Sequence, residues 1–558
     1  MGALSLARAH ATSMNAPRTG TGIAPEFEGC AESIGSGASQ SMLQGSLRSS
    51  ANASLPREGV ARGTLLPSTD LDLHRSPAHR LNSVPGRPLR VMKFGGTSVG
   101  DASCIRRVTK IIEAASRADR VVAVVSAMSG VTNKLIEAGT RAAAGDIAAV
   151  DGIFDGLRHQ HETAARTLIR SVGARMCLVE QIAALIDEGR HACRQVMEQR
   201  ELAASARDLI SGIGERLSAP IVAAALVDGG VPSEAIEATE IIVTSSRHGA
   251  AEAHIELTRL RCGECLGPRL LRGVTPVVTG FLGATVEGVP TTLGRGGSDY
   301  SATILGAALG ADEVVIWKDV DGVKTADPRF VPSAETLSEA SYREVADLTH
   351  FGAKVLHPGT LRPLVKCGIP VWIRNTFAPE GRGTKITRDG VRRRRKVLAS
   401  TTDVALVTIP GLCTARMQST LASMLANTAA SRPGLLLAAR GSLQDDASDD
   451  ASVVVSSELL EHVVSVLRSG LGQDRKSKHR VEVRVNRDVA LVTVVGENPQ
   501  EAPVMTQRTL DALTAQGVEI LAMSQDSSRG SISFVVARDA LSVMLVTAHR
   551  EFQLKLHR

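Results

Sequence analysis

Between residues 89 and 385, short runs of aliphatic residues alternate with longer segments whose apolar positions recur at helical spacing. Continuous apolar runs separated by helical segments are typical of a parallel sheet whose strands are buried on both faces. The pattern predicts a long helical stretch between Asp151 and Leu226 and strands at Val91–Phe94, Val121–Ser126, Pro276–Gly280, Glu313–Lys318 and Pro370–Arg374. We therefore expect residues 89–385 to form an α/β domain with a mainly parallel sheet.

The pattern changes after residue 400, where strand-like runs and single helix-like segments follow one another. The last part predicts the order βαββα, which is that of a ferredoxin-like unit: strand 489–495, helix 503–516, strands 518–523 and 531–536, and helix 538–550. Residues 400–485 resemble a degenerate copy of residues 486–558, interrupted by the acidic run Asp445–Asp450. We expect two α+β domains with these bounds.

Residues 1–88 carry neither pattern and are rich in Ser, Ala, Gly, Arg and Pro, which predicts a disordered extension. No acidic residue precedes Glu26, as in many organelle transit peptides. The alternative is a start codon assigned too far upstream. We accordingly expect a cytoplasmic protein, or a plastid or other organelle protein if residues 1–88 are a transit peptide.

Composition excludes several classes of protein. The 558 residues need more than one core, and 43% hydrophobic with 22% charged residues is ordinary for a globular chain. The net charge of +6 invites a nucleic-acid partner, but two Tyr, two Trp and nine Phe leave little for base stacking. Part of that charge lies in Arg392–Lys396, within a segment, 386–399, that we expect to be a basic linker. No apolar run appears long enough in sequence to predict a membrane span, and the eight scattered cysteines indicate reduced thiols. We expect no nucleic-acid or membrane partner and no protein-held metal.

Two glycine-containing turns carry the candidate chemistry. Lys93 lies in the first predicted strand and is followed by Gly95, Gly96 and Ser98. Further along, Gly294–Asp299 places an arginine between glycines ahead of an apolar, helix-like segment. Glycine lets backbone N–H groups approach a multiply charged anion, and a helix N-terminus adds partial positive charge. Since the sequence contains no P-loop motif, we expect these turns to bind phosphate. For the first turn alone, a lysine pointing to water is the alternative.

Two later stretches place further lysines beside glycine or acidic residues. Lys318–Arg329 follows a predicted strand, and its acids lack the spacing and the terminal Glu of a calcium-binding EF-hand. We expect a nucleotide-binding loop there. Phe351–Pro358 contains Lys354 and also His357, which we expect to be a packed core histidine.

Five motifs, in this order, resemble those of aspartate kinases in the amino acid kinase superfamily: KFGGTSV at 93–99, SAMSGVTN at 126–133, TTLGRGGSDYSA at 291–302, WKDVDGVKTADPR at 317–329 and FGAKVLHP at 351–358. The part after residue 400 resembles the paired ACT domains of this family. The resemblance implies a carbamate-kinase-like α/β/α sandwich followed by two ACT domains. It also implies phosphorylation of the β-carboxylate of L-aspartate by ATP, which opens lysine, threonine, methionine and isoleucine biosynthesis.

The same resemblance implies roles for individual residues. Lys93 is expected to bridge the transferred phosphoryl group and Asp299 to organise the catalytic groups. Four residues are expected to bind L-aspartate, with Glu215 receiving the ammonium and Arg295 a carboxylate: Ser126, Thr132, Glu215 and Arg295. Seven are expected to bind ATP, which brings Mg²⁺ with it: Gly95, Gly96, Ser98, Lys318, Asp319, Arg329 and Lys354.

The ACT resemblance implies an amino-acid effector, lysine or threonine, and a homodimer or homotetramer formed through the ACT domains. ACT domains that serve only as a dimer platform are the alternative. For the whole chain, one alternative is a kinase portion related to the bifunctional aspartate kinase–homoserine dehydrogenases, although the sequence carries no dehydrogenase fingerprint. Another is a catalytically silent amino-acid sensor, against which the presence of Lys93, Arg295 and Asp299 argues.

Overall fold

The computed structural model describes residues 87–353, 356–357, 359–390, 396–410, 435–440, 451–471, 482–496, 502–526 and 531–553. Four sequence expectations therefore lie outside the described residues: those for residues 1–86, for Lys354, for the basic residues Arg392–Arg395 and for the acidic run Asp445–Asp450.

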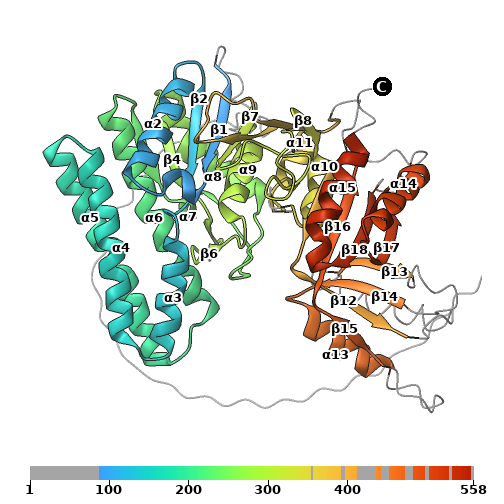
Figure 1. The fold of residues 1–558 in the computed structure, drawn as a ribbon. Coiled ribbons are helices and arrows are strands. Elements are labelled where there is room, and N and C mark those ends of the chain that lie inside the picture. Colours follow the sequence, from blue (N-terminus) through green and yellow to red (C-terminus); the bar gives the residue numbers. More distant parts are fainter. Residues whose placement is uncertain are drawn as a thin grey trace, which may run out of the picture. The chain divides into compact units, whose positions relative to one another are not determined.

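An eight-stranded sheet forms the centre of the first domain (Figure 1), with the strand order β3-β4-β2-β1-β7-β9-β10-β8. Its strands are β1 (Leu89–Phe94), β2 (Arg120–Val125), β3 (Ser233–Ile236), β4 (Thr275–Thr279), β7 (Glu313–Lys318), β8 (Glu339–Ser341), β9 (Val371–Asn375) and β10 (Thr384–Thr387). All neighbouring pairs are parallel except β9 with β10. The mainly parallel sheet is confirmed, and all five predicted strands are present in it.

The central strands are apolar throughout because helices cover both faces of the sheet. Along β1, Leu89 and Val91 join one buried cluster, whereas Met92 and Phe94 join another, as the two-residue repeat of a strand requires. One cluster receives residues of α2 (Ala102–Ser116), α3 (Val131–Ala143), α4 (Ile147–Leu168), α5 (Val172–Gln199) and α6 (Ala204–Asp228). The other receives residues of α7 (Ala238–Ile241), α8 (Ile255–Leu271), α9 (Gly297–Leu309), α10 (Tyr342–His350) and α11 (Arg362–Cys367). This is the expected α/β/α sandwich.

The predicted helical stretch between residues 151 and 226 consists of three helices, α4 to α6. Ser171 caps the start of α5 by accepting from the N–H of Ala174, and Arg200 ends it in a left-handed conformation. By length and composition α6 could cross a membrane, which differs from the sequence expectation. However, 72% of the 18-residue apolar stretch of α6 is buried inside the protein, as in a core helix of a globular domain.

Two four-stranded antiparallel sheets follow the first domain. One has the order β13-β14-β12-β15, formed by β12 (Val404–Ile409), β13 (Leu435–Arg440), β14 (Ala451–Ser456) and β15 (Arg484–Asn486), with α13 (Leu460–Leu471). The other has the order β11-β16-β18-β17, formed by β11 (Val397–Thr401), β16 (Val489–Val495), β17 (Ile520–Asp526) and β18 (Ser531–Ala537), with α14 (Ala502–Ala515) and α15 (Leu541–Gln553). The βαββα order of the last segment matches the expectation.

The two sheets share one topology, with one difference in connectivity. In the first, the edge strand beside β12 is β15, which follows it in sequence; in the second, the edge strand beside β16 is β11, which precedes the whole first unit. The expected linker 386–399 therefore ends inside a strand of the second unit. The first unit is an insertion between that strand and the rest of its sheet.

We expect Leu398→Asp to lower the thermal unfolding midpoint by about 4 °C or more, because a buried unpaired carboxylate costs more than about 2 kcal/mol. Leu398 is 6% exposed and packs in the core of the second sheet with Val494 and Phe534. Ser400→Asp, at a partly exposed position of the same strand, is the matched control and should shift the midpoint by less than about 1 °C. Equal midpoints for the two variants would show that the segment behaves as a linker.

Candidate active site

The two predicted glycine turns meet at a buried cluster of ion pairs. Lys93 of β1 places its Nζ 2.5 Å from Oδ1 of Asp299, in the first turn of α9. Lys318, the last residue of β7, places its Nζ 3.0 Å from Oδ2 of the same carboxylate. Because β1 and β7 are parallel neighbours, both lysines lie toward the carboxyl edge of the sheet, where such folds bind their ligands.

The carboxylate of Asp299 is ionised in spite of its burial. Its side chain is 6% exposed. Burial acts to raise the pKa of Asp299, but the charges of Lys93 and Lys318 outweigh it, so this pKa lies below its ordinary value. The cluster carries one net positive charge, which suits an anionic ligand.

The glycines after Lys93 differ in what their N–H groups do. The N–H of Gly95 donates to the carbonyl of Trp317 (3.2 Å), so it is not the free phosphate donor that we expected. In the part of the chain that the structure describes, the N–H of Gly96 has no acceptor. A Cβ atom on Gly96 would lie 3.0 Å from the carbonyl oxygen of Ala127, so glycine allows this turn to approach the segment after β2.

Ser98, which is expected to bind ATP, has a hydrogen-bond partner within the protein. It is fully buried, and its Oγ lies 2.7 Å from Oγ1 of Thr376. This hydrogen bond joins the short 3-10 turn η1 (Gly96–Val99) to the residue after β9. Ser98 therefore supports the glycine turn through this contact.

Glu215 lies in α6, next to the segment that carries Ser126 and Thr132. A Cβ on Gly214 would lie 2.7 Å from Cβ of Ala127, so this glycine is what allows the helix to pack so closely. Glu215 is 3% exposed, and its Oε2 has no hydrogen-bond partner among the described residues. Burial raises the pKa of Glu215 to about 8, although the backbone of Ala127 and the charge of Lys93 act in the opposite direction. An unsatisfied buried acceptor of this kind fits a cationic ligand group. Ser126 and Thr132 are both partly exposed.

Arg295 is exposed in the turn before α9, and no acidic residue in the described ranges pairs with it. Gly296 adopts a left-handed conformation (φ 71°) and begins α9 without a side-chain cap, which leaves the helix N-terminus open to an anion. A Cβ on Gly296 would lie 2.8 Å from Cβ of His357. Our expectation of a packed core histidine is wrong, because His357 is exposed beside this turn. Partial burial, Arg295 and Arg362 together lower the pKa of His357.

The other residues predicted to bind the nucleotide are not joined to the Lys93 cluster in the described structure. Asp319 is exposed directly after Lys318. Arg329 pairs with Asp327 at 2.5 Å within its own loop and is 75% exposed, so no described contact joins it to the Lys93 cluster. Lys354 lies outside the described residues.

Sequence reasoning missed two residues that support the site, Thr376 and Asp208. Thr376 gives no sequence signal, because its partner Ser98 is 278 residues away. For Asp208 a signal exists: it is an acidic residue at the start of an apolar helical run, and it is 2% exposed in the structure. Among the described residues, no group of three or more His, Cys, Asp or Glu side chains is placed to hold a metal ion.

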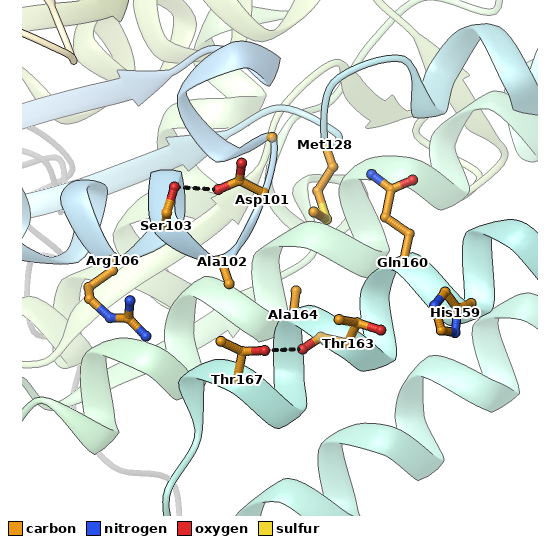
Figure 2. Close-up of a pocket in the computed structure, with 11 residues that line it drawn as sticks. Asp101, Ala102, Ser103, Arg106, Met128, His159, Gln160, Thr163, Ala164 and Thr167 are labelled. Atoms are coloured by element: carbon orange, nitrogen blue, oxygen red, sulfur yellow. Dashed lines mark hydrogen bonds between the residues drawn. The ribbon is translucent and has the colours of Figure 1, made fainter.

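A cavity of about 560 Å³ between the start of α2 and α4 is separate from these residues (Figure 2). None of the predicted site residues lines it. Asp101 in its wall caps α2, accepting from the N–H of Cys104 and from Oγ of Ser103, both at 2.8 Å. Thr167 donates to the carbonyl of Thr163. These polar groups are satisfied within their own helices, so they give no sign of a catalytic role.

Comparison with known proteins connects this geometry to a family. The amino acid kinase family model matches residues 88–375, and an ACT domain model matches residues 492–552. Aspartokinase 3 of Arabidopsis thaliana is 30% identical over 86% of this chain and 85% of its own length. The aspartokinase of Schizosaccharomyces pombe is 30% identical over 85% of this chain and 95% of its own.

Longer relatives also match. The bifunctional aspartokinase/homoserine dehydrogenase 1 of Zea mays is 30% identical, and the chain spans half of its length. Among solved structures, E. coli aspartokinase III in complex with aspartate and ADP is 25% identical, with a TM-score of 0.69 over 83% of this chain and 99% of that one. These likenesses confirm the family that the five motifs resemble.

We expect Glu215→Gln to become more stable relative to the parent chain as the pH rises. The pKa of Glu215 is about 8 in the folded chain against an ordinary 4.5. Its protonated form thus contributes stability that is complete below about pH 4.5 and is lost as the pH rises to about 8. The difference in unfolding free energy between variant and parent should grow over this window by at most about 1.4 kcal/mol per pH unit.

Thermal midpoints at about pH 5.5, 7 and 8.5 measure this trend. Glu256→Gln, at a 79% exposed glutamate of α8, is the matched control and should show no such trend. A difference for Glu215→Gln that stays flat with pH would contradict the raised pKa.

Proposed function

Because the chain belongs to the aspartokinases of the amino acid kinase family, we propose that it transfers the γ-phosphoryl group of Mg-ATP to the β-carboxylate of L-aspartate. The products are 4-phospho-L-aspartate and ADP. The observation that carries the proposal is the buried cluster in which Asp299 holds Lys93 and Lys318 together at the carboxyl edge of the sheet.

Phosphoryl transfer to a carboxylate requires neutralisation of charge more than it requires a general base. A carboxylate is already a nucleophile at neutral pH. One of its oxygens forms the new P–O bond while the bond between the γ-phosphorus and the β,γ-bridging oxygen breaks, and ADP leaves with that electron pair. The barrier is dominated by repulsion between the carboxylate and the polyphosphate, and fixed cations and dipoles lower it. Lys93 and Lys318 are such cations, and the Mg²⁺ that enters with ATP is another.

Asp299 gives these cations their position. Without it, the two ammonium groups would repel each other and reorient when the phosphate arrives. With it, their geometry is fixed before the substrate binds, which is the condition for electrostatic catalysis. In this proposal Lys93 contacts the transferred phosphoryl group, and the free N–H of Gly96 and the open N-terminus of α9 add donors to the same anion.

The aspartate substrate fits the groups that remain. Arg295 is free to bind a carboxylate in a bidentate pair. Glu215, buried and with an unpartnered oxygen, is suited to the ammonium. Because an adjacent cation favours the ionised carboxyl, binding of the ammonium should release the proton of Glu215. A further support is the ADP and aspartate bound in the E. coli relative of the same fold.

The direct test is to trap the acyl phosphate as the hydroxamate, with aspartate, Mg-ATP and hydroxylamine. We expect Lys93→Ala to lower turnover by at least a factor of about 100, or about 2.7 kcal/mol of barrier, since it removes a cation from the transferred group. Lys110→Ala, at an exposed lysine of α2, is the control and should stay within about twofold. A folded parent chain that forms no hydroxamate would end the proposal.

We further propose that an amino acid, lysine or threonine, regulates the enzyme through the ACT units. What supports this is a pair of contacts between the second unit and the loop after Lys318. Oγ1 of Thr325, in this loop, lies 3.1 Å from Nε2 of His549 on α15. The N–H of Leu398 donates to the backbone carbonyl of Thr325 at 2.8 Å. A change in this unit therefore acts on the segment that follows a phosphate-site lysine.

We expect lysine or threonine at millimolar concentration to lower the rate of hydroxamate formation at least about fivefold, the lower end of common allosteric couplings. Each amino acid is added separately, and alanine serves as the control ligand. Light scattering of the same samples measures whether the proposed homodimer or homotetramer forms and changes. If neither amino acid alters the rate, the units serve only for assembly.

A further inference from the structure

A buried carboxylate in α6 connects the backbone segments that surround the proposed aspartate site. Oδ1 of Asp208 accepts from Oγ1 of Thr292 at 2.5 Å, and Oδ2 accepts from the N–H of the same residue at 3.2 Å. Nδ1 of His248 lies 2.8 Å from Oδ2, and the N–H of Gly249 lies 3.1 Å from both oxygens. Four donors from two separate segments thus converge on one carboxylate that is 2% exposed.

The two segments are also joined to each other. The N–H of Ala251 donates to the carbonyl of Thr292 at 2.9 Å, and a Cβ on Gly294 would lie 2.9 Å from the carbonyl oxygen of Gly249. Thr292 ends β6 (Pro290–Thr292), three residues before Arg295. The backbone on the N-terminal side of the Arg295 turn is therefore attached to Asp208.

Asp208 and Glu215 lie on one helix, seven residues apart. Seven residues are close to two helical turns, so both side chains project from the same side of α6. One rigid element consequently carries the acceptor proposed for the ammonium and the anchor of the turn that carries the carboxylate-binding arginine. Arg295 itself is exposed and has no acidic partner among the described residues, so its position depends on its backbone.

We infer that Asp208 is a positioning residue for the amino-acid substrate, which fixes the distance between Arg295 and Glu215 and thereby the fit of the two ends of L-aspartate. The inference rests on the proposed function. The nucleotide side of the site depends on Lys93, Lys318 and Asp299, none of which contacts Asp208 in the described structure. Loss of the carboxylate should therefore weaken aspartate binding selectively.

The test compares Asp208→Asn with Asp228→Asn in the hydroxamate assay. The asparagine keeps the shape of Asp208 but turns an NH₂ group toward backbone N–H donors. Asp228 is the matched control, because it is the last residue of α6 and its carboxylate accepts from the N–H and Nε of Arg170. We expect Asp208→Asn to raise KM for aspartate at least tenfold with KM for ATP within twofold, and Asp228→Asn to leave both within twofold.

Two results would overturn the inference: a KM for aspartate that stays within twofold, or KM values for aspartate and ATP that rise together, as a purely structural role would produce. Thr292→Val removes one donor hydroxyl and decides the question if Asp208→Asn does not fold. It should raise KM for aspartate at least threefold with KM for ATP unchanged, and an unchanged KM for aspartate would overturn the inference. Absence of hydroxamate with the parent chain would instead refute the proposed function.

Discussion

The ion pairs of Asp299 with Lys93 and Lys318 are the interaction around which the catalytic domain is organised. They join a helix N-terminus to the ends of two central strands, so the sheet order and the α9 turn must both be correct for the cluster to form. A buried ion pair adds little net stability, because desolvation offsets most of its Coulomb energy. The cluster is therefore better explained by the proposed phosphoryl transfer, because it keeps a net positive charge in a buried site, where that charge would act strongly on a phosphate.

The surroundings of two buried carboxyl groups in this site shift their pKa values in opposite directions. Asp299 lies between two lysines and has a lowered pKa, whereas Glu215 has burial without a paired cation and a pKa raised to about 8. Environments that separate the pKa values of neighbouring acids commonly divide their roles. Asp299 is a permanent anion that orders the lysines. The Oε2 of Glu215 has no hydrogen-bond partner among the described residues, and in the proposed function it receives the ammonium of the substrate.

Sequence reasoning predicted what depends on local pattern and failed where partners are distant. Apolar runs located five strands of the parallel sheet, and the glycine turns identified Lys93 and Asp299 before their contact was known. The pattern could not show that β11 pairs with β16, because strand pairing across 90 residues leaves no local trace. It likewise gave no sign of the partners that Gly95 and Ser98 have within the protein. Their hydrogen bonds to Trp317 and Thr376 depend on how β7 and β9 lie beside β1.

The insertion of one ACT unit into the other has a physical consequence for the proposed regulation. Because β11 directly precedes the inserted unit and its partner β16 directly follows it, the inserted unit is connected in sequence to two neighbouring strands of the second sheet. Leu398 of this strand donates to Thr325, and Thr325 follows Lys318 in the same loop. A shift at the strand can therefore alter the lysine that pairs with Asp299 without unfolding either domain. Coupling of this kind needs a chain of direct contacts that can adopt two alternative arrangements. The backbone hydrogen bond between Leu398 and Thr325 is the link in this chain that lies next to the catalytic domain.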